Sequence, residues 1–249
     1  MCARQPRIAV VIPTLNEAGS IDALLQAVFA LDLELQVYVM DDGSVDGTLE
    51  ILDILAAEHA SLHVVRRDGA RGYGKACTEG LQRALQDGAD VLLQMDGDLS
   101  HDPSYIPAML DAALDADLVL GSRYLKGVSV ANWSLKGLLL PIAANFYVRA
   151  FTGVKTRDCT TGYRLWHRSL LEQIELQEVR SEGYAFIVET LFRASRLSQR
   201  ITEVPIIFIE RKLGHSKLSS RVILESPILP LRLFSVRVLD LLRFRGDPG

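Results

Sequence analysis

The sequence predicts an α/β fold in which helices cover both faces of a mostly parallel central sheet. Apolar runs of strand length alternate with segments of helix length from Ile8 to about Tyr124, and this alternation is typical of βαβ units. Two of the apolar runs end in acidic residues, Asp41-Asp42 and Asp96-Gly97-Asp98. Because ligands of an open parallel sheet bind beyond the carboxyl ends of its strands, both acidic ends are expected at one binding edge.

Periodicity and turn residues predict the elements of the first half. The expected strands are Ile8–Ile12, Leu35–Met40, Leu62–Arg66, Val91–Met95 and Leu118–Leu120. Each is an apolar run bounded by turn residues. The first helix begins after Ser20, which is a typical N-cap residue, and the next two end near His59 and Leu85. The fourth begins at Pro103, whose missing N–H has no consequence in a first helical turn.

The second half is less regular. We expect an apolar helix over Trp133–Phe151, a polar loop over Arg157–Arg164, a helix over Gly183–Leu197 and a strand over Glu203–Phe208. Pro205 has no backbone N–H to donate, so the last of these belongs at an edge of the sheet. A basic loop over Glu210–Lys217 follows, and the remaining tail has helical character.

The amino-acid composition is typical of an ordinary globular protein. Its 249 residues are 49% hydrophobic and 23% charged, which suffices for one large domain or one domain with an appendage. The net charge of −4 is not that of a nucleic-acid-binding protein. The three cysteines lie far apart without metal-ligand spacing, which favours a reducing compartment. The polar N-terminus leads directly into a strand, so we expect no signal peptide.

The C-terminal segment has a composition of its own. Between Arg211 and Arg245 it carries eight basic and two acidic residues, interleaved with large apolar residues. Such a pattern is typical of a helix that lies in a membrane interface and is attracted by anionic lipid. A core-packed helix with a basic outer face is the alternative. We therefore expect a catalytic domain over 1–217 and an amphipathic basic tail over 218–249.

The central motif is the acidic pair Asp96 and Asp98 after the fourth expected strand. Two carboxylates this close repel each other unless a cation lies between them or one is protonated. Oxygen ligands without a nearby Cys or His cluster suit Mg²⁺ or Mn²⁺, which also bind substrate phosphates. A plain strand-to-helix turn with an aspartate N-cap is the alternative. The D-x-D-x-[ST] pattern also occurs in haloacid-dehalogenase-type phosphatases, although those usually carry it on their first strand.

Other residues near the strand ends have candidate roles. Arg123, Arg211 and Lys217 are candidate phosphate ligands, because a guanidinium or ammonium group stabilises a departing diphosphate. One of Asp41 and Asp42 is expected to accept hydrogen bonds from a ribose or a base, while the other caps the turn. His101, beside the acidic pair, is expected to cap rather than to catalyse.

Together the motifs resemble inverting family 2 glycosyltransferases of the GT-A fold. The later ones are similar to those of dolichyl- or polyprenyl-phosphate mannosyltransferases, which use GDP-mannose. The motifs that carry the resemblance are Pro13–Glu17, Asp41–Thr48, Met95–His101, Gly121–Tyr124, Asn132–Ser134, Asp158–Arg164, Gly183–Phe186 with Glu189, Glu203–Ile206, Arg211 and Ser216-Lys217. The resemblance implies transfer of mannose from GDP-mannose to a polyprenyl monophosphate. UDP-glucose or another donor on the same fold is the first alternative, and a phosphatase is a remote one.

The resemblance also implies site residues. Asp42, with the backbone at Met40, would hold the guanosine half of the donor. Mg²⁺ or Mn²⁺ would lie at Asp96 and Asp98, with Ser100 as a third contact. The implied donor-binding set is Pro13, Leu15, Glu17, Met40, Asp42, Met95, Asp96, Gly97, Asp98, Arg123, Arg211 and Lys217. The implied catalytic set is Asp98, Arg123, Arg211 and Lys217.

Two departures from the family pattern lie inside this set. Leu15 stands where the family commonly has Tyr, and Gly97 replaces the usual Ala. Some relatives carry membrane helices after this domain, and this chain resembles the type without them. We therefore expect a cytoplasmic protein that associates peripherally with the cytoplasmic face of a membrane, where its lipid acceptor lies.

Overall fold

A computed structural model describes residues 5–125, 127, 129–131, 135–209 and 228–238. Arg211 and Lys217, both predicted to contact phosphates, lie outside the described residues. Trp133, at the predicted start of the apolar helix, also lies outside them. Of the expected tail over 218–249, the structure describes 228–238, which is helical.

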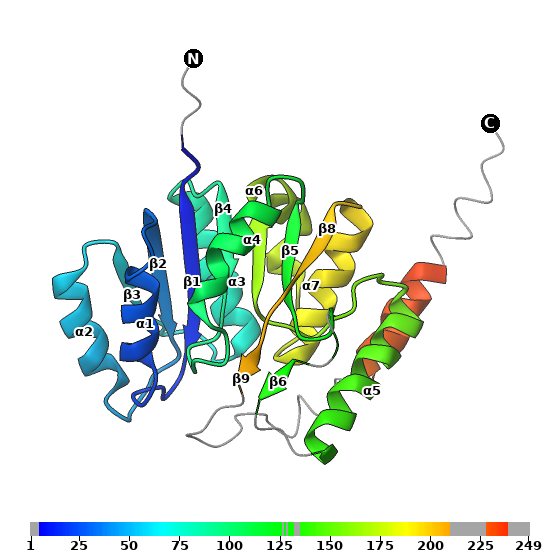
Figure 1. The fold of residues 1–249 in the computed structure, drawn as a ribbon, viewed down its shortest axis with the longest axis horizontal. Helices are drawn as coiled ribbons and strands as arrows, with labels where there is room; N and C mark the ends of the chain where they lie inside the picture. Colours follow the sequence, from blue (N-terminus) through cyan, green and yellow to red (C-terminus); the bar gives the residue numbers. More distant parts are fainter. Residues whose placement is uncertain (1–4, 126, 128, 132–134, 210–227, 239–249) are drawn as a thin grey trace.

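A seven-stranded sheet forms the centre of the fold, in the order β3-β2-β1-β4-β7-β5-β8 (Figure 1). Its strands are β1 (Ile8–Thr14), β2 (Leu35–Asp41), β3 (Leu62–Arg66), β4 (Val91–Gln94), β5 (Leu118–Ser122), β7 (Arg164–His167) and β8 (Ile201–Pro205). Only β7 runs antiparallel to its neighbours, β4 and β5, while the other pairs are parallel. The short β6 (Val130–Ala131) pairs with β9 (Phe208–Ile209). The expectation of a mostly parallel α/β sheet is confirmed.

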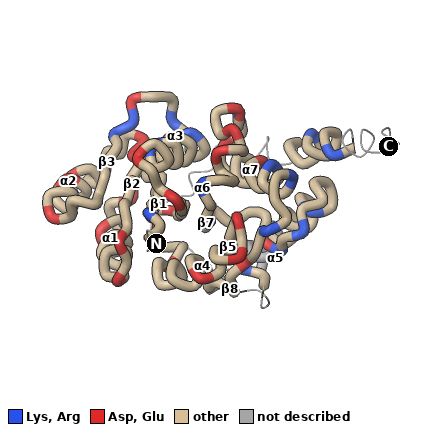
Figure 2. Tube along the Cα trace, turned by 90° about the horizontal axis from the view of Figure 1, so that it is seen from above, with Lys and Arg blue, Asp and Glu red and all other residues tan. Residues whose placement is uncertain are grey.

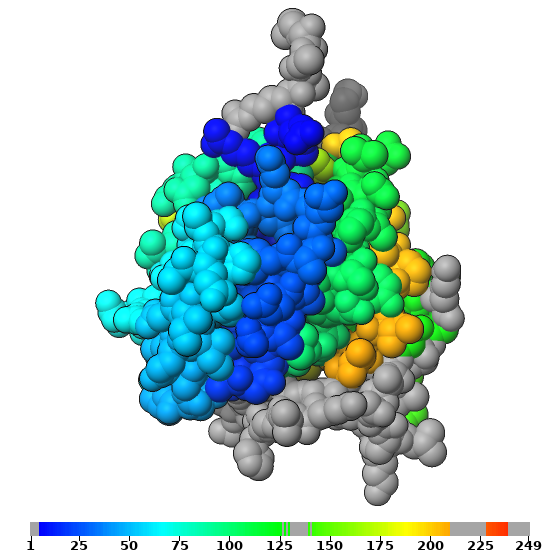
Figure 3. All heavy atoms as spheres, turned by 60° about the vertical axis from the view of Figure 1, so that its left-hand side comes forward, coloured from blue at the N-terminus to red at the C-terminus, as the bar shows by residue number. Residues whose placement is uncertain are grey.

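Helices cover both faces of this sheet. They are α1 (Ile21–Phe29), α2 (Thr48–Glu58), α3 (Tyr73–Gln86), α4 (Ile106–Ala112), α5 (Leu135–Thr152), α6 (Arg168–Leu171) and α7 (Tyr184–Leu197), with the 3-10 turns η1 (Pro103–Tyr105), η2 (Glu172–Ile174) and η3 (Leu176–Glu178). Seen along the strands, α1 and α4 lie on one side and α3 and α7 on the other (Figure 2). On the side of the sheet where α1 lies, α1 and α2 form the molecular surface, in shades of blue (Figure 3).

Alternating residues of the strands divide the core in two. On β1, Val10 and Ile12 pack with the apolar faces of α1, α2 and α4, whereas Ala9 and Val11 pack with those of α3 and α7. This is the period of two that a strand imposes, and a parallel sheet covered on both faces needs apolar residues on both. The continuous apolar runs of the sequence follow from that requirement.

The second half departs from expectation in two places. The predicted polar loop over Arg157–Arg164 ends in β7, which lies between β4 and β5. Its four residues are Arg164, Leu, Trp and His167, and a buried arginine in so short a strand hides the apolar pattern. The predicted strand over Glu203–Phe208 is split, since β8 ends at Pro205 and β9 begins at Phe208. The edge position inferred from Pro205 is confirmed, because β8 is an outer strand.

Membrane-spanning segments were also not expected. Within the ranges that the structure describes, no helix combines the length and the apolar character that crossing a bilayer requires.

Candidate functional site

The loops after β1, β2 and β4 meet at one edge of the sheet. In the β1–β2 register Thr14 lies opposite Asp41, and the N–H of Met95 donates to the carbonyl of Val11 at 3.1 Å. Hydrogen bonds between the loops then join them. The Asn16 N–H donates to Ser44 Oγ at 2.8 Å, and the Ser20 hydroxyl donates to the Gly97 carbonyl at 2.9 Å.

Those links gather most of the predicted donor residues at this edge. Pro13, Leu15 and Glu17 lie in or directly after the end of β1 and are partly exposed. The side chains of Met40 and Met95 are 0% exposed, which leaves their backbone groups for the predicted donor contacts.

The two aspartates at the end of β2 have different partners. Asp41 is fully buried and accepts hydrogen bonds from the N–H groups of Gly43 and Ser44, both at 2.9 Å. It is therefore the residue that caps the turn. Asp42 accepts from the Gly72 N–H at 2.8 Å and pairs with Arg67, so it holds the glycine-rich basic loop after β3 against the edge. Its contact with guanosine stays a prediction.

Asp96 is held by two groups that lie deeper in the fold. Its side chain is 30% exposed, and its Oδ1 accepts a hydrogen bond from the Tyr73 hydroxyl at 3.0 Å. Its backbone N–H donates to Nδ1 of His101 at 3.0 Å. Burial lowers the pKa of His101, and the ring stacks on Tyr163 at 4.9 Å between centroids. His101 thus caps this loop, as expected from the sequence.

Asp98 is held within its own turn. Its Oδ1 accepts from the Ser100 N–H at 3.1 Å and from the Ser100 hydroxyl at 2.5 Å. Between them Leu99 has a φ of 62°, a left-handed conformation that non-glycine residues adopt only where the surroundings impose it. Ser100 is 1% exposed and orients Asp98 by donating to it. Its direct contact with a metal ion stays a prediction.

The acidic pair offers a divalent cation hard oxygen ligands. Among the described residues, no three or more His, Cys, Asp or Glu side chains gather as they would in a preformed metal centre. Asp96 and Asp98 are both partly exposed, so a cation bound to them would take its remaining ligands from water or phosphate oxygens. This donor set fits Mg²⁺ or Mn²⁺, which bind through one or two carboxylates and substrate phosphates, and does not fit zinc.

Arg123, at the end of β5, is bound to a buried carboxylate. Its Nε and Nη2 donate to the two oxygens of Asp158 at 2.7 and 2.8 Å, and Nη2 also donates to Thr160 Oγ1 at 2.7 Å. Burial would raise the pKa of Asp158, but the charge and hydrogen bonds of Arg123 hold it below its usual range. The structure therefore gives Arg123 a structural partner, and its contact with a diphosphate stays a prediction.

Three residues beside Asp96 were given no individual role by the sequence analysis. Tyr73, the first residue of α3, accepts a hydrogen bond from Gln94 Nε2 at 3.1 Å and donates its own hydrogen bond to Asp96 Oδ1. A Cβ atom on Gly162 would lie 2.7 Å from the Tyr73 hydroxyl and 3.3 Å from Asp96 Oδ1, so any larger residue there would force Tyr73 to shift. Tyr73 follows a loop rich in glycine and arginine, but no local pattern in the sequence places this tyrosine beside Asp96.

Gly162, beside Asp96, and Gly97, between the two aspartates, give two alanine variants whose stabilities can be compared. We expect Gly162→Ala to lower the free energy of unfolding by about 1–3 kcal/mol, because the methyl group collides with packed side chains. Gly97→Ala would place its Cβ at 3.5–3.6 Å from its neighbours, which is ordinary contact, and we expect stability to be unchanged or raised by up to about 1 kcal/mol. Chemical unfolding of both variants checks this, and equal effects would contradict it.

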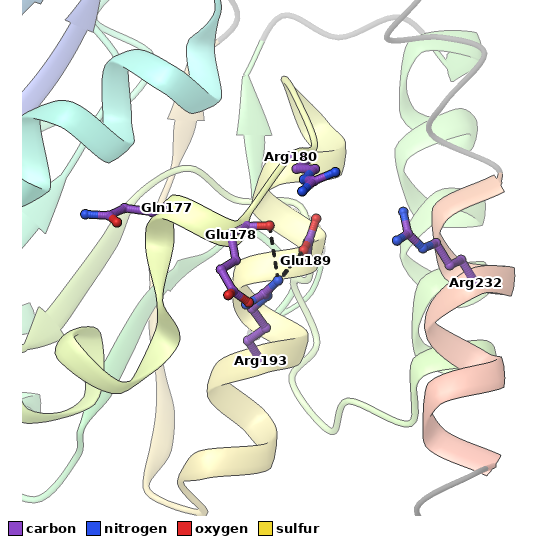
Figure 4. Close-up of a pocket in the computed structure, with 6 residues that line it drawn as sticks. All are labelled: Gln177, Glu178, Arg180, Glu189, Arg193 and Arg232. Carbon is purple, nitrogen blue, oxygen red and sulfur yellow. Dashed lines mark hydrogen bonds and ion pairs between the residues drawn. The ribbon is translucent and has the colours of Figure 1, made fainter.

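A hollow of about 370 Å³ lies between α7, the turn before it and the 228–238 helix (Figure 4). It is lined by Gln177, Glu178, Arg180, Glu189, Arg193 and Arg232. Glu189 belongs to one of the motifs quoted above, but its carboxylate accepts from Ser181 at 2.5 Å and pairs with Arg193 at 3.0 Å. Of the predicted donor and metal residues that the structure describes, none lines this hollow.

Comparison with known proteins identifies relatives over most of the chain. Residues 9–175 match the family described as Glycosyl transferase family 2. An undecaprenyl-phosphate mannosyltransferase from Micrococcus luteus is 40% identical over 222 residues, covering 89% of this chain and 91% of that protein. A polyprenol monophosphomannose synthase from Mycolicibacterium smegmatis is also 40% identical over 222 residues, covering 88% of this chain and 84% of that protein.

Solved structures show the same fold at lower identity. Glucosyl-3-phosphoglycerate synthase from Mycobacterium tuberculosis, in complex with Mn²⁺, UDP-glucose and phosphoglyceric acid, superposes with a TM-score of 0.69 and 19% identity, covering 93% of this chain and 80% of that one. The same synthase with UDP alone gives a TM-score of 0.65 and 20% identity, covering 93% and 81%.

Proposed function

This chain belongs to glycosyl transferase family 2, and from that premise we propose that it transfers mannose from GDP-mannose to a polyprenyl monophosphate with inversion at the anomeric carbon. One observation of the site carries the proposal: Asp96 and Asp98 are held, partly exposed, where the loops after β1, β2 and β4 meet. Further support comes from two relatives, each 40% identical over most of the chain, whose names are those of polyprenyl-phosphate mannosyltransferases.

The reaction needs the nucleoside diphosphate to leave. Mg²⁺ or Mn²⁺, bound through Asp96 and Asp98, would neutralise negative charge that develops on the departing diphosphate. Arg211 and Lys217 are proposed to share that role, and Arg123 to meet the diphosphate or the acceptor phosphate. Asp42 and the backbone at Met40 are proposed to orient the guanosine half of the donor.

The acceptor phosphate does not need a strong base. Its second pKa is about 6, so it is already a nucleophilic dianion near neutral pH. The described site agrees with this requirement, because His101 is 1% exposed and its Nδ1 accepts the Asp96 N–H. A histidine held in this way caps a loop and is not available to take a proton from the acceptor.

Transfer of radiolabelled sugar tests the proposal. We expect GDP-mannose to label polyprenyl phosphates, excess GDP to compete more strongly than UDP, and a chelator to abolish labelling until Mg²⁺ or Mn²⁺ is restored. Labelling from UDP-glucose instead would establish the alternative donor, which the fold shared with glucosyl-3-phosphoglycerate synthase makes the second candidate. Release of phosphate without sugar transfer would point to the phosphatase, although here the motif follows β4 and not the first strand.

The helix over 228–238 bears on the proposed membrane association. Its inner side is packed, since Leu229 and Leu233 are buried in the same core as Val148 of α5 and the rings of Phe151 and Phe234 meet edge to face at 5.8 Å. Its outer side and that of the adjacent α5 (Figure 1) expose large apolar residues. These are Leu139, Ile142, Phe146, Ile228, Leu231 and Val236. Core packing and lipid contact, the two alternatives from the sequence, are thus compatible on opposite sides of one helix.

We expect the double variant Phe146→Asp, Leu231→Asp to bind anionic liposomes at least about tenfold more weakly. Each apolar side chain contributes about 1.5–3 kcal/mol when it leaves water, and the added carboxylates repel anionic lipid. Ile54→Asp is the control, because Ile54 is 63% exposed on α2, beside the opposite end of the sheet (Figure 1). If the unmodified protein, the double variant and the control co-sedimented equally with liposomes, this surface would be excluded as the membrane-binding surface.

A further inference from the structure

We propose that Tyr73 is a positioning residue that holds the Asp96 carboxylate in the orientation a divalent cation requires. This inference rests on the proposed function and extends it to a residue outside the acidic motif. The Tyr73 hydroxyl donates to Asp96 Oδ1 at 3.0 Å, and the amide of Gln94 donates to the same hydroxyl oxygen at 3.1 Å. Because Gln94 occupies the acceptor side of the hydroxyl, the single proton of Tyr73 is directed at Asp96.

Tyr73 is itself fixed by two carboxylates at the start of α3. Asp42 accepts from the N–H of Gly72 at 2.8 Å, and Glu182 accepts from the N–H of Gly74 at 2.9 Å. The first N–H groups of a helix have no partner within the helix, so these two bonds satisfy them and immobilise the residue between them. Gly72 has a φ of 151°, and a Cβ there would lie 2.5 Å from Glu182.

The ring of Tyr73 is also held in place by packing. It meets Phe186 of α7 edge to face at 6.3 Å between centroids, and Gly162 leaves the space in which its hydroxyl reaches Asp96. With His101 bound to the backbone of the same residue, Asp96 is held from two directions.

The arrangement connects two parts of the site. Asp42, proposed to meet the nucleoside, holds Gly72, and the next residue, Tyr73, holds Asp96, proposed to meet the cation. Groups that orient a metal ligand from behind in this way commonly change metal affinity about 10–100-fold when they are removed. Loss of the Tyr73 hydroxyl should therefore be seen in cation binding itself, before any sugar is transferred.

Tyr73→Phe tests the inference, because it removes the hydroxyl and keeps the ring against Phe186. Tyr38→Phe is the matched control: the Tyr38 hydroxyl also donates to an aspartate, Asp87, at 2.8 Å, but Asp87 follows the C-terminal end of α3. We expect the dissociation constant of Mn²⁺, titrated in the presence of GDP and followed by electron paramagnetic resonance, to rise about tenfold or more in Tyr73→Phe. Tyr38→Phe should bind Mn²⁺ as the unmodified protein does.

Asp98→Ala separates failure of this inference from failure of the proposed function. If Asp98→Ala weakens Mn²⁺ binding while Tyr73→Phe binds as tightly as the unmodified protein, or more tightly, the positioning role is wrong and the metal site stands. If Asp98→Ala also leaves Mn²⁺ binding unchanged, the metal site and the inference built on it are both wrong. Melting curves for every variant establish that the folded protein is being titrated.

Discussion

Asp98→Ala is expected to lower the rate of sugar transfer about a thousandfold or more while the protein remains folded. Asp98 is proposed to bind the cation, and loss of such a carboxylate would remove several kcal/mol of transition-state charge stabilisation. Each 1.36 kcal/mol is about a factor of ten in rate. The fold should survive, because the Asp98 side chain is partly exposed and its Oδ1 bonds within its own turn, to Ser100.

Steady-state transfer from GDP-mannose and thermal unfolding together measure the effect. Asp111→Ala is the control, because it removes an exposed carboxylate of α4 outside the site and is expected to leave both quantities unchanged. If Asp98→Ala retained transfer within about tenfold, Asp98 would contribute only about 1.4 kcal/mol or less to lowering the barrier. That is less than the several kcal/mol assigned to the cation, and the proposed mechanism would fail.

The second large effect concerns stability. Asp158→Ala is expected to lower the free energy of unfolding by about 3–5 kcal/mol, because it leaves the buried guanidinium of Arg123 without its counter-charge. Arg123 is 5% exposed and Asp158 is fully buried, so water cannot replace the lost partner. Breaking the pair between Arg200 and Asp117 by Arg200→Gln should cost about 1 kcal/mol or less, because Arg200 is 66% exposed.

This stabilisation depends on pH with a defined sign. The pKa of Asp158 is lower in the folded protein than in the unfolded chain, so its contribution is fully present above the unfolded value of about 4. It is lost as the pH falls through the lower, folded value. Urea unfolding of Asp158→Ala and of the unmodified protein should therefore give converging stabilities below about pH 4.

A double variant then separates structure from chemistry at Arg123. Replacing the pair by apolar residues, as in Arg123→Met with Asp158→Leu, should recover most of the lost stability, because no buried charge is left unpaired. If Arg123 also meets the diphosphate or the acceptor, the double variant will be stable and poorly active. A stable and fully active double variant would limit Arg123 to its structural role.

Local patterns in the sequence determined much of the fold and one side of the site. Apolar runs placed β1 to β5, and turn chemistry placed the acidic residues at their carboxyl ends, because strand burial and turn formation depend on neighbours along the chain. The same reasoning failed for β7, where a buried arginine is the first of only four strand residues. It also did not assign which of Asp41 and Asp42 caps the turn.

The sequence alone was sufficient for the α/β class, the acidic pair and the family, since each is written in contiguous residues. Only the tertiary structure decided that Tyr73 bonds to Asp96 across 23 positions and that Arg123 pairs with Asp158 across 35. Such partners are chosen by the path of the chain around the sheet. A hydroxyl or a carboxylate has no local periodicity that says which distant backbone will bring it within hydrogen-bonding distance.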